Sequence, residues 1–408
     1  MKKLLILGAT YSELVIIERA KRRGIYTIVT DNNTDYSKSP AKLYADEAWD
    51  ISWSDINALT IKAQEAGVSG ILAGFSEFRV ENMIKLCESL NLPCPLTLDQ
   101  LEITRDKIKF KRLCEQYDIP CVPEYQLGDS INFPVIIKPV DRAGSIGINV
   151  AKSAEQFEQY YKCALSLSPS KSVIVEKFIT DGIKVDFYYY ALNGKITLLA
   201  TSDTIMCDGV SAAPILQKAW IFPSKYENEY LSDIDPKVKK MLEGLGIANG
   251  YVTISSFYSH GDFYFFEAGF RLSGEMSFNF YEKLTGCNYV DLLIDYAFNM
   301  HSTTSLKECV GEKSRSVILN FFVKDGVINK ITLPVNEPTL IASNIYVREK
   351  ERIINETDVL KKAVMFTLYS QNDTDLLKGI QHVNNQIAII GQDGQDLIYE
   401  KVIPETLL

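Results

Sequence analysis

The sequence has very little histidine and no paired metal-binding pattern. Its 408 residues contain three histidines, His260, His301 and His382. None stands beside a serine or cysteine nucleophile motif, and none belongs to an HExxH or similar zinc pattern. The sequence therefore argues against a hydrolase built on a histidine triad and against a zinc enzyme.

Paired cysteines and long apolar runs are also missing. The eight cysteines are scattered with no CxxC pair, which is typical of reduced thiols that serve as small apolar residues. The apolar run that follows Met1-Lys2-Lys3 covers only Leu4–Leu7 and ends at Gly8, too short for a secretory core or a membrane span. We expect a cytoplasmic protein that is not embedded in a membrane.

There is no excess of basic residues. The net charge is −9, whereas a nucleic-acid binder usually has a basic stripe, so we expect no nucleic-acid partner. Hydrophobic residues make up 46% of the chain, which is typical of a globular protein. The length predicts two or three domains.

The first hundred residues alternate between strand and helix patterns. Strands are predicted at Leu4–Leu7, Ile25–Thr30, Trp49–Ile51 and Ile71–Ala73, and helices at Ser12–Arg23, Ile56–Ala66 and Val80–Leu90. This alternation predicts a parallel sheet with crossover helices.

A dinucleotide-binding fingerprint is not present in this region. The GxGxxG pattern would need glycines where Thr10 and Glu13 stand, although Asp31 ends the second strand like a ribose-binding acid. Of the three functions that we consider for this sequence, a nicotinamide-dependent dehydrogenase therefore ranks last.

The rest of the chain is richer in strands. After Leu92-Pro93-Cys94-Pro95, a helix is predicted to begin with a cap at 104–107 and to run to Tyr117. Further helices are expected at Glu155–Leu165 and Lys237–Leu245. The segment Asp203–Ile221, which includes Trp220, reads as an irregular connection that either lines the acceptor pocket or is a solvated loop. Near the end, Val317–Val323, a turn and Val327–Ile331 predict a hairpin.

Three separated segments carry groups suited to phosphate chemistry. Lys107 lies near the start of a predicted helix, and Lys138 ends the strand Phe133–Pro139 before a loop of small residues. In the third segment Glu267 ends an apolar strand and Arg271 follows four residues later. Glycine-rich backbone and a lysine suit phosphate oxygens, a carboxylate suits Mg²⁺, and a guanidinium suits phosphoryl charge. Taken singly, Lys107 reads as an ordinary solvated lysine of a helix. The Lys138 segment reads equally well as a plain β-hairpin, and Glu267 with Arg271 reads more readily as an ion pair that caps a strand.

With the strand Val173–Ile179 between them, the order of these motifs resembles the ATP-grasp superfamily over roughly residues 1–305. The final hundred residues look like the β-rich domain of carbamoyl-phosphate-synthase-like and L-amino-acid-ligase members. The resemblance implies a mixed α/β and α+β fold. It has a Rossmann-like domain (1–100), an ATP-grasp domain of two α+β subdomains (101–308, with a lid at about 122–190) and a β-rich domain (309–408).

The resemblance also implies roles for individual residues. Lys107 and Lys138 would hold the ATP phosphates, Glu267 would ligate Mg²⁺ (or Mn²⁺), and Arg271, with Lys138, would act in catalysis on the acyl-phosphate. The lid loop and the adenine-binding hinge would supply further nucleotide contacts, at Gly144, Ser145 and Gly147 in the loop and at Glu176, Lys177, Phe178 and Ile179 in the hinge.

Some positions depart from the family pattern. Gly269 and Phe270 stand where the family has Asn and Pro, and the preceding strand offers only hydroxyls at Thr253–Ser256. The acid that binds ribose is replaced at Ile183 or Lys184, so Asp186 is the nearest carboxylate. These departures leave Glu267 as the one Mg²⁺ ligand among the expected positions.

The leading hypothesis is a ligase that uses ATP and Mg²⁺ to convert a carboxylate into an acyl-phosphate. It would join that group to an amine or thiol, with small-molecule substrates, and the resemblance implies a homodimer. A nucleotide-binding regulatory protein without turnover is the second alternative. Glu275 and Phe278–Tyr281 follow Arg271 and could contact substrate or serve packing.

Overall fold

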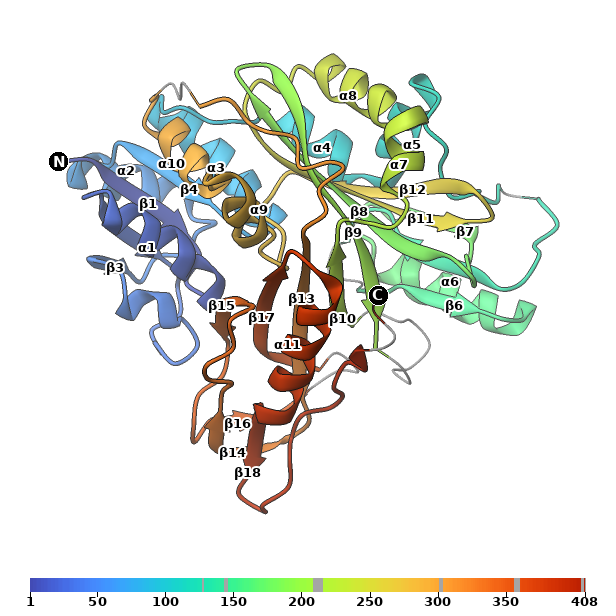
Figure 1. Cartoon of the computed structure of the whole chain (residues 1–408). Coiled ribbons are helices and arrows are strands. Elements are labelled where there is room, and N and C mark those ends of the chain that lie inside the picture. The colour runs from blue at the N-terminus through green and yellow to red at the C-terminus, as the bar shows by residue number, and fades with distance from the viewer. Residues whose placement is uncertain are drawn as a thin grey trace.

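The computed structural model describes residues 1–126, 128–142, 146–207, 216–300, 304–355, 360–404 and 407. Its described strands form four sheets, and Figure 1 shows how they follow one another along the chain. The predicted mixed α/β fold, with a parallel sheet and a large antiparallel sheet, is confirmed. Within the described residues, every helix is too short or too polar to cross a lipid bilayer.

The N-terminal sheet is parallel, with strand order β3-β2-β1-β4. Its strands are β1 (Lys3–Leu7), β2 (Tyr26–Thr30), β3 (Glu47–Trp49) and β4 (Gly70–Ala73). The helices around it are α1 (Leu14–Arg22), α2 (Ile56–Ala66), α3 (Glu77–Leu90) and α10 (Tyr289–Ala297). Leu4–Leu7 is fully buried, as expected for a strand covered on both faces.

The largest sheet is antiparallel, in the order β12-β11-β8-β9-β10-β13-β17-β15. Its strands are β8 (Ile183–Leu192), β9 (Lys195–Met206), β10 (Gln217–Phe222), β11 (Gly250–Ser259), β12 (Asp262–Gly269), β13 (Arg315–Val323), β15 (Leu340–Ile345) and β17 (Lys361–Ser370). The sheet continues across residue 308, because β10 pairs with β13. The division into three domains stays a prediction.

Beside this sheet lie α4 (Leu98–Arg105), α5 (Lys107–Gln116), α7 (Glu227–Asp233), α8 (Asp235–Gly244) and α9 (Phe278–Thr285). The predicted start of a helix near Lys107 is confirmed. The Asp106 carboxylate accepts the backbone N–H groups of Ile108 and Lys109, so it caps α5 and separates it from α4.

A small three-stranded sheet carries the lysine-ending strand. It consists of β5 (Val135–Pro139), β6 (Asn149–Ala151) and β7 (Val173–Lys177), and α6 (Ala154–Leu167) packs on it. Its own apolar core, which includes Val135, Ile137 and Ala164, is separate from the main core.

The last hundred residues contain the expected strands but not the expected hairpin. β13 lies between β10 and β17, whereas β14 (Gly326–Thr332) pairs with β16 (Arg352–Ile353) and β18 (Ala388–Gly391). The hairpin prediction was wrong because β13 is buried on both faces and belongs in the middle of the large sheet. The helix α11 (Asp373–Gln386) packs on β13 and β17.

The irregular connection predicted at Asp203–Ile221 is also corrected. Asp203–Met206 belongs to β9 and Gln217–Ile221 belongs to β10, and the two strands pair. Residues 208–215 lie outside the described residues. The strands were not predicted because small polar and apolar residues alternate in this segment, and the polar side chains are buried in the sheet.

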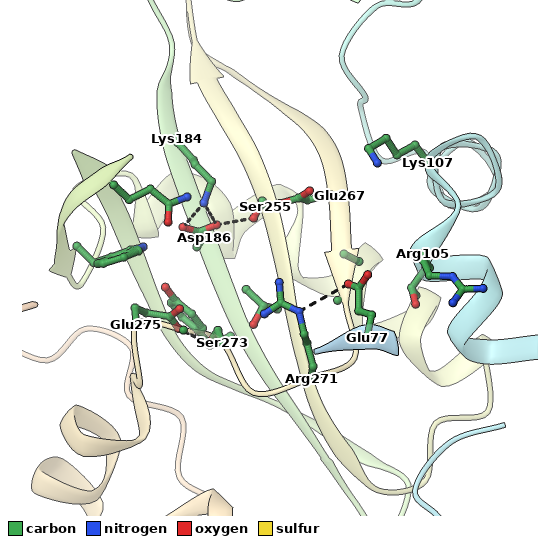
Figure 2. A pocket seen from close by; sticks show the side chains of 18 of the residues that line it. Glu77, Arg105, Lys107, Lys184, Asp186, Ser255, Glu267, Arg271, Ser273 and Glu275 are labelled. Atoms are coloured by element: carbon green, nitrogen blue, oxygen red, sulfur yellow. Dashed lines mark hydrogen bonds and ion pairs between the residues drawn. The ribbon is translucent and has the colours of Figure 1, made fainter. Parts of the chain in front are cut away.

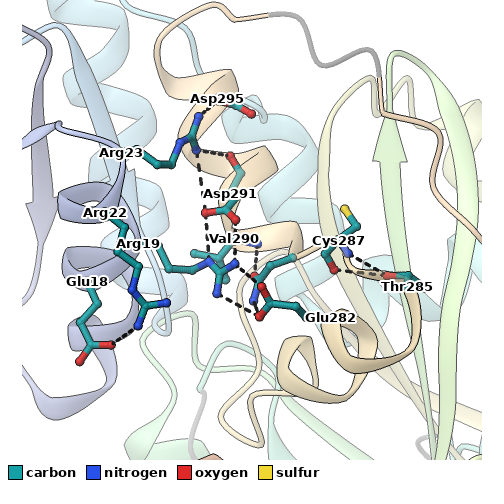
Figure 3. A network of polar contacts seen from close by, with 11 residues as sticks. Glu18, Arg19, Arg22, Arg23, Glu282, Thr285, Cys287, Val290, Asp291 and Asp295 are labelled. Carbon is teal, nitrogen blue, oxygen red and sulfur yellow. Dashed lines mark hydrogen bonds and ion pairs between the residues drawn. The ribbon is translucent and has the colours of Figure 1, made fainter.

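Ion pairs tie the N-terminal unit to the helices that follow β12. The Arg19 guanidinium of α1 contacts Glu282 of α9 at 2.6 Å and Asp291 of α10 at 2.7 Å (Figure 3). Arg23, one turn later, contacts Asp295. These contacts fix the N-terminal sheet against the segment that carries Arg271 and Glu275 toward α9.

We expect Arg19→Met to lower the free energy of unfolding by about 1–2 kcal/mol, since two partly exposed carboxylates lose their shared partner. Arg22→Met is the matched control, because Arg22 is 70% exposed and lies 3.6 Å from Glu18. That control should change stability by less than about 0.5 kcal/mol. Urea unfolding measures both, and equal losses in the two variants would contradict the bridging role of Arg19.

Candidate active site

A cavity of about 250 Å³, open to solvent, lies where the N-terminal unit, α4, α5 and the large sheet meet. Its lining comes from the start of α3, the α4–α5 junction, four strands of the large sheet and the loop that follows β12. Arg142 and Ile148, which lie in the chain between residues 139 and 149, also contribute to it. Figure 2 shows side chains from these separate elements pointing into a common space. The sequence segments containing Lys107, Glu267 and Arg271 all reach it.

Lys107 is the first residue of α5, and its side chain is held at the edge of this cavity. Its ammonium donates to the backbone carbonyl of Arg142 at 2.9 Å. Burial lowers the pKa of Lys107, while the carboxylate of Glu267 acts in the opposite direction. Lys107 and Glu267 therefore interact electrostatically, although they are far apart in the sequence.

Arg271 and Glu77 form a second charged pair on the wall. Arg271 follows β12, and its Nε lies 3.8 Å from Oε1 of Glu77 at the start of α3. Burial raises the pKa of Glu77, and the nearby Arg271 opposes that rise. Arg271 is thus held by the N-terminal unit, with its guanidinium still partly exposed to the cavity.

Lys138 lies in the wall behind the cavity lining. Its ammonium is 2.6 Å from one oxygen of Glu176, and Lys111 of α5 is 2.7 Å from the other. Lys138 also lies over the ring of Phe266, the neighbour of Glu267. Burial alone would raise the pKa of Glu176, but the two lysines hold it below its ordinary value.

The hinge after β7 has specific backbone partners. The N–H of Lys177 donates to Pro123 and the N–H of Phe178 donates to Pro134. Ile179 follows these two residues just past the strand. The backbone of Lys177 and Phe178 is therefore tied to the flanking chain.

Asp186 of β8 lies on the cavity wall and is surrounded by donors. The Lys184 ammonium reaches both of its oxygens, at 2.5 and 2.6 Å, and Ser255 and Thr204 each donate a hydroxyl. Ser255 stands directly opposite Glu267 in the β11–β12 pairing. The position across from Glu267 thus presents a hydroxyl, and its hydrogen bond goes to Asp186.

The predicted residues lie in different places, and those of the hinge, Lys177, Phe178 and Ile179, are not among the residues that line the cavity. Lys107, Asp186, Glu267 and Arg271 line one cavity, and Lys138 and Glu176 are buried beside it. Gly147 has φ +77°, and a side chain there would meet Pro139 at 2.9 Å, so glycine is required. Gly144 and Ser145 lie outside the described residues. The functional roles of all these residues stay predictions.

Sequence reasoning missed the contribution of the N-terminal unit to this cavity. Glu77 follows β4, and side chains at the carboxyl ends of parallel strands commonly form binding sites, so this signal was available. Arg105 and Trp220 also line the cavity. Trp220 belongs to the segment Asp203–Ile221, for which we expected either a place in the lining of a pocket or a solvated loop, and it lies in the lining although the segment is not irregular.

The residues present fit one divalent cation with few protein ligands. Among the described residues, no group of three or more His, Cys, Asp or Glu side chains is arranged to hold a metal. Glu267 is exposed at the cavity. Mg²⁺ commonly takes one or two carboxylates and completes its shell with water and phosphate oxygens.

The parallel sheet, the small sheet with its hinge and the antiparallel sheet around this cavity are those of an ATP-grasp protein. Residues 115–206 match the family described as D-ala D-ala ligase C-terminus. This segment is therefore similar to an ATP-grasp domain, and the chain as a whole has the fold of such proteins.

The particular proteins it resembles are ligases and carboxylases. The large chain of carbamoyl phosphate synthase from Archaeoglobus fulgidus is 25% identical over 366 residues, which cover 83% of this chain and 32% of the relative. The chain thus spans about a third of that relative's length.

Two solved structures have closely similar folds over 96% of this chain. The L-amino acid ligase from Bacillus licheniformis has a TM-score of 0.77 with 18% identity and 99% of its chain covered. The biotin carboxylase domain of the 2-oxoglutarate carboxylase from Hydrogenobacter thermophilus, in complex with MgADP and bicarbonate, has a TM-score of 0.80 with 19% identity and 91% covered.

We expect Glu176→Gln to lower the free energy of unfolding at pH 7 by about 3–5 kcal/mol, because Lys111 and Lys138 lose their buried counter-ion. The pKa of Glu176 is depressed, so its stabilising charge is fully present above the ordinary value of 4.5 and is lost as pH falls through the folded value. The gap between wild type and variant should therefore shrink below pH 4.5. Urea unfolding across this range measures the gap, and a constant gap would contradict the assignment.

Proposed function

We propose that this protein is an ATP-dependent ligase. It uses ATP with Mg²⁺ to convert a carboxylate into an acyl-phosphate, and it joins that group to an amine or similar nucleophile with release of ADP and phosphate. The observation that carries the proposal is the convergence of Lys107, Glu267 and Arg271 on one cavity. A cation, a metal-binding carboxylate and a guanidinium are the groups that phosphoryl transfer requires.

Each group has a distinct part in the proposed site. Lys107 binds phosphate oxygens from the edge of the cavity, and Lys138 adds positive charge from the wall behind it. Arg271 binds the phosphoryl oxygens of the intermediate, with Glu77 holding its side chain. Glu176, Lys177, Phe178 and Ile179 hold the adenine at the hinge mostly through backbone groups, because the Glu176 carboxylate is bound by Lys111 and Lys138.

Glu267 is the proposed ligand of Mg²⁺. The ion neutralises charge on the phosphates when it is bound. The residue across from Glu267 is Ser255, which has no carboxylate, and Asp186 is paired with Lys184. Glu267 is therefore the exposed carboxylate at this end of the cavity. The residues of this chain therefore orient the reacting groups and neutralise the charge on the phosphates, and no histidine is needed as a general base.

A second candidate is a protein that binds MgATP without turnover. The observation in its favour is the hydroxyl of Ser255 opposite Glu267, where a second carboxylate is expected from the family resemblance. Binding of ATP by calorimetry, with no ADP released across a panel of acids and amines, would favour this candidate over the ligase.

We expect Lys107→Met to weaken ATP binding by about tenfold or more, because a charge-assisted hydrogen bond to phosphate is lost. Lys109→Met is the matched control. Lys109 lies two residues away on the same helix, is exposed and pairs with Glu102, outside the cavity. Calorimetry with MgATP and an ADP-release assay measure the effect, and unchanged affinity in Lys107→Met would refute the phosphate-binding role.

Glu267→Gln should raise the Mg²⁺ concentration for half-maximal ADP release by about tenfold or more, since a neutral amide is a poorer ligand for a hard cation. Asp262→Asn is the control, because Asp262 is an exposed carboxylate at the other end of β12. A titration of Mn²⁺ in the presence of ADP, followed by electron paramagnetic resonance, reads metal binding without turnover. Equal metal affinity in both variants would contradict the assignment.

A further inference from the structure

Two segments of the chain repeat one cysteine pattern. Residues 87–94 read CESLNLPC and residues 114–121 read CEQYDIPC. Both segments place an Asn or Asp, an aliphatic residue and a Pro-Cys pair at the same distance behind a Cys-Glu pair. The two cysteines of each segment are seven positions apart, which is a longer spacing than that of a CxxC pair.

Each segment ends a helix in the same way. Cys87 lies in the last turn of α3, and Cys114 lies in the last turn of α5. Asn91 and Asp118 follow these helices with φ of 53° and 54°, so the chain reverses at the same position in both segments. The N–H of the next residue donates to the carbonyl of the first cysteine, at 2.9 Å in the first segment and 3.0 Å in the second. The chain therefore folds back over the last helical turn and brings the second cysteine toward the first.

The two thiols of each segment are in contact. The S–H of Cys87 donates to the sulfur of Cys94, and the S–H of Cys114 donates to the sulfur of Cys121. Cys87 and Cys114 are buried, whereas Cys94 and Cys121 are partly exposed. The hydrogen bond from Cys87 lowers the pKa of Cys94, which favours its reactive thiolate form. Each pair thus joins a sulfur that a reagent can reach to a buried sulfur beside it.

Both pairs lie at the far end of a helix whose first residue lines the cavity. The helix α3 begins with Glu77 and α5 begins with Lys107, and Figure 2 shows both side chains at the cavity. The second segment is also joined to β12, because the N–H of Val122 donates to the carbonyl of Phe265 at 3.0 Å. A change in bonding between the cysteines therefore acts on elements that carry residues of the cavity.

We propose that Cys87 with Cys94, and Cys114 with Cys121, form reversible disulfides, and that the oxidised protein binds MgATP more weakly than the reduced protein. A disulfide holds its two sulfurs at about 2.05 Å, which is closer than the contact of two hydrogen-bonded thiols. Closing each bond therefore draws the last turn of the helix toward the loop that follows it. Lys107 moves with α5, so its position at the cavity changes. The effect on MgATP, unlike the disulfides themselves, rests on the proposed function.

The chemical step is thiol–disulfide exchange with a low-molecular-weight disulfide. The thiolate of Cys94 attacks one sulfur of the reagent, the S–S bond of the reagent breaks, and the first thiol leaves with the proton that Cys94 gave up. Cys87 then loses its proton and attacks the sulfur of Cys94, and the second thiol leaves with that proton. Each protein pair gives up two electrons and two protons, and each reagent molecule becomes two thiols. Cys121 and Cys114 react in the same order.

Peptide masses test the disulfides. The protein is incubated with oxidised glutathione, its remaining thiols are alkylated, and it is digested with trypsin. Each pair lies within one tryptic peptide, 86–105 or 113–142, that contains no other cysteine. We expect each peptide to lose the mass of two hydrogen atoms and to carry neither an alkyl group nor glutathione. Dithiothreitol should restore both thiols.

Cys163 is the control residue for this experiment. It is exposed in the middle of α6 and does not belong to the repeated pattern. It should therefore take up glutathione as a mixed disulfide under the same conditions.

Calorimetry with MgATP tests the link to the cavity. We expect the oxidised wild type to bind MgATP at least about fivefold more weakly than the reduced protein, and dithiothreitol should restore the affinity. The double variant Cys94→Ser with Cys121→Ser can close neither bond, so its affinity should equal that of the reduced wild type under both conditions. Cys163→Ser is the matched control and should respond to oxidation as the wild type does. Melting temperatures of the reduced proteins separate misfolding from a lost response.

Different results would overturn different parts of the inference. Glutathione bound to Cys94 or Cys121 in place of the internal bond would overturn the assignment of that pair. Equal affinity of the oxidised and reduced wild type for MgATP would overturn the link to the cavity, even if the disulfides form. If the reduced protein binds no MgATP, the proposed ligase function fails and the link fails with it, whereas the peptide masses still decide whether the disulfides form.

Discussion

The arrangement of the proposed site depends on one buried carboxylate. Glu176 of β7 lies between Lys111 of α5 and Lys138 of β5, at 2.7 and 2.6 Å. Removing three charges from water is costly, and only close pairing compensates for that cost. The pairing therefore admits one relative position of the helix and the small sheet. Lys107 lies one turn before Lys111 on the same helix, so its place at the cavity follows from this contact.

Much of this architecture was readable from the sequence because it rests on local patterns. Buried parallel strands form continuous apolar runs, which can be recognised in the sequence. Asp106 is a typical N-cap residue and indicates where α5 begins. Lys107, Glu267 and Arg271 could be selected because each stands at the end of a helix or strand, where side chains reach a shared cavity. Their meeting place was inferred from a family resemblance, and the geometry agrees with that inference.

The features that escaped prediction depend on long-range pairing. No local sequence pattern indicates that β13 pairs with β10 rather than with β14, which follows it in the chain. This pairing depends on the burial of β13 on both faces. The partner of Lys138 was equally hidden, since Glu176 is 38 residues away and reads from sequence as part of an adenine hinge. Glu77 enters the cavity from the N-terminal unit, which carried no motif of its own.

The distribution of charge in the cavity separates structural carboxylates from those available to ligands. Asp186 has Lys184 and two hydroxyls, and Glu77 lies beside Arg271, so both are neutralised within the chain. Of the carboxylates that line the cavity in the described ranges, Glu267 and Glu275 have no Lys, Arg or His nitrogen within 4.0 Å.

These two carboxylates differ in burial, and that difference suggests different partners. Glu267 is exposed and faces Ser255, which suits a hydrated metal ion that keeps water and phosphate in its shell. Glu275 is buried among the hydroxyls of Ser273 and Ser277, where a hydrated ion would have to lose most of its water. The same negative charge at two depths is therefore accessible to a hydrated metal ion at Glu267 and closed to one at Glu275.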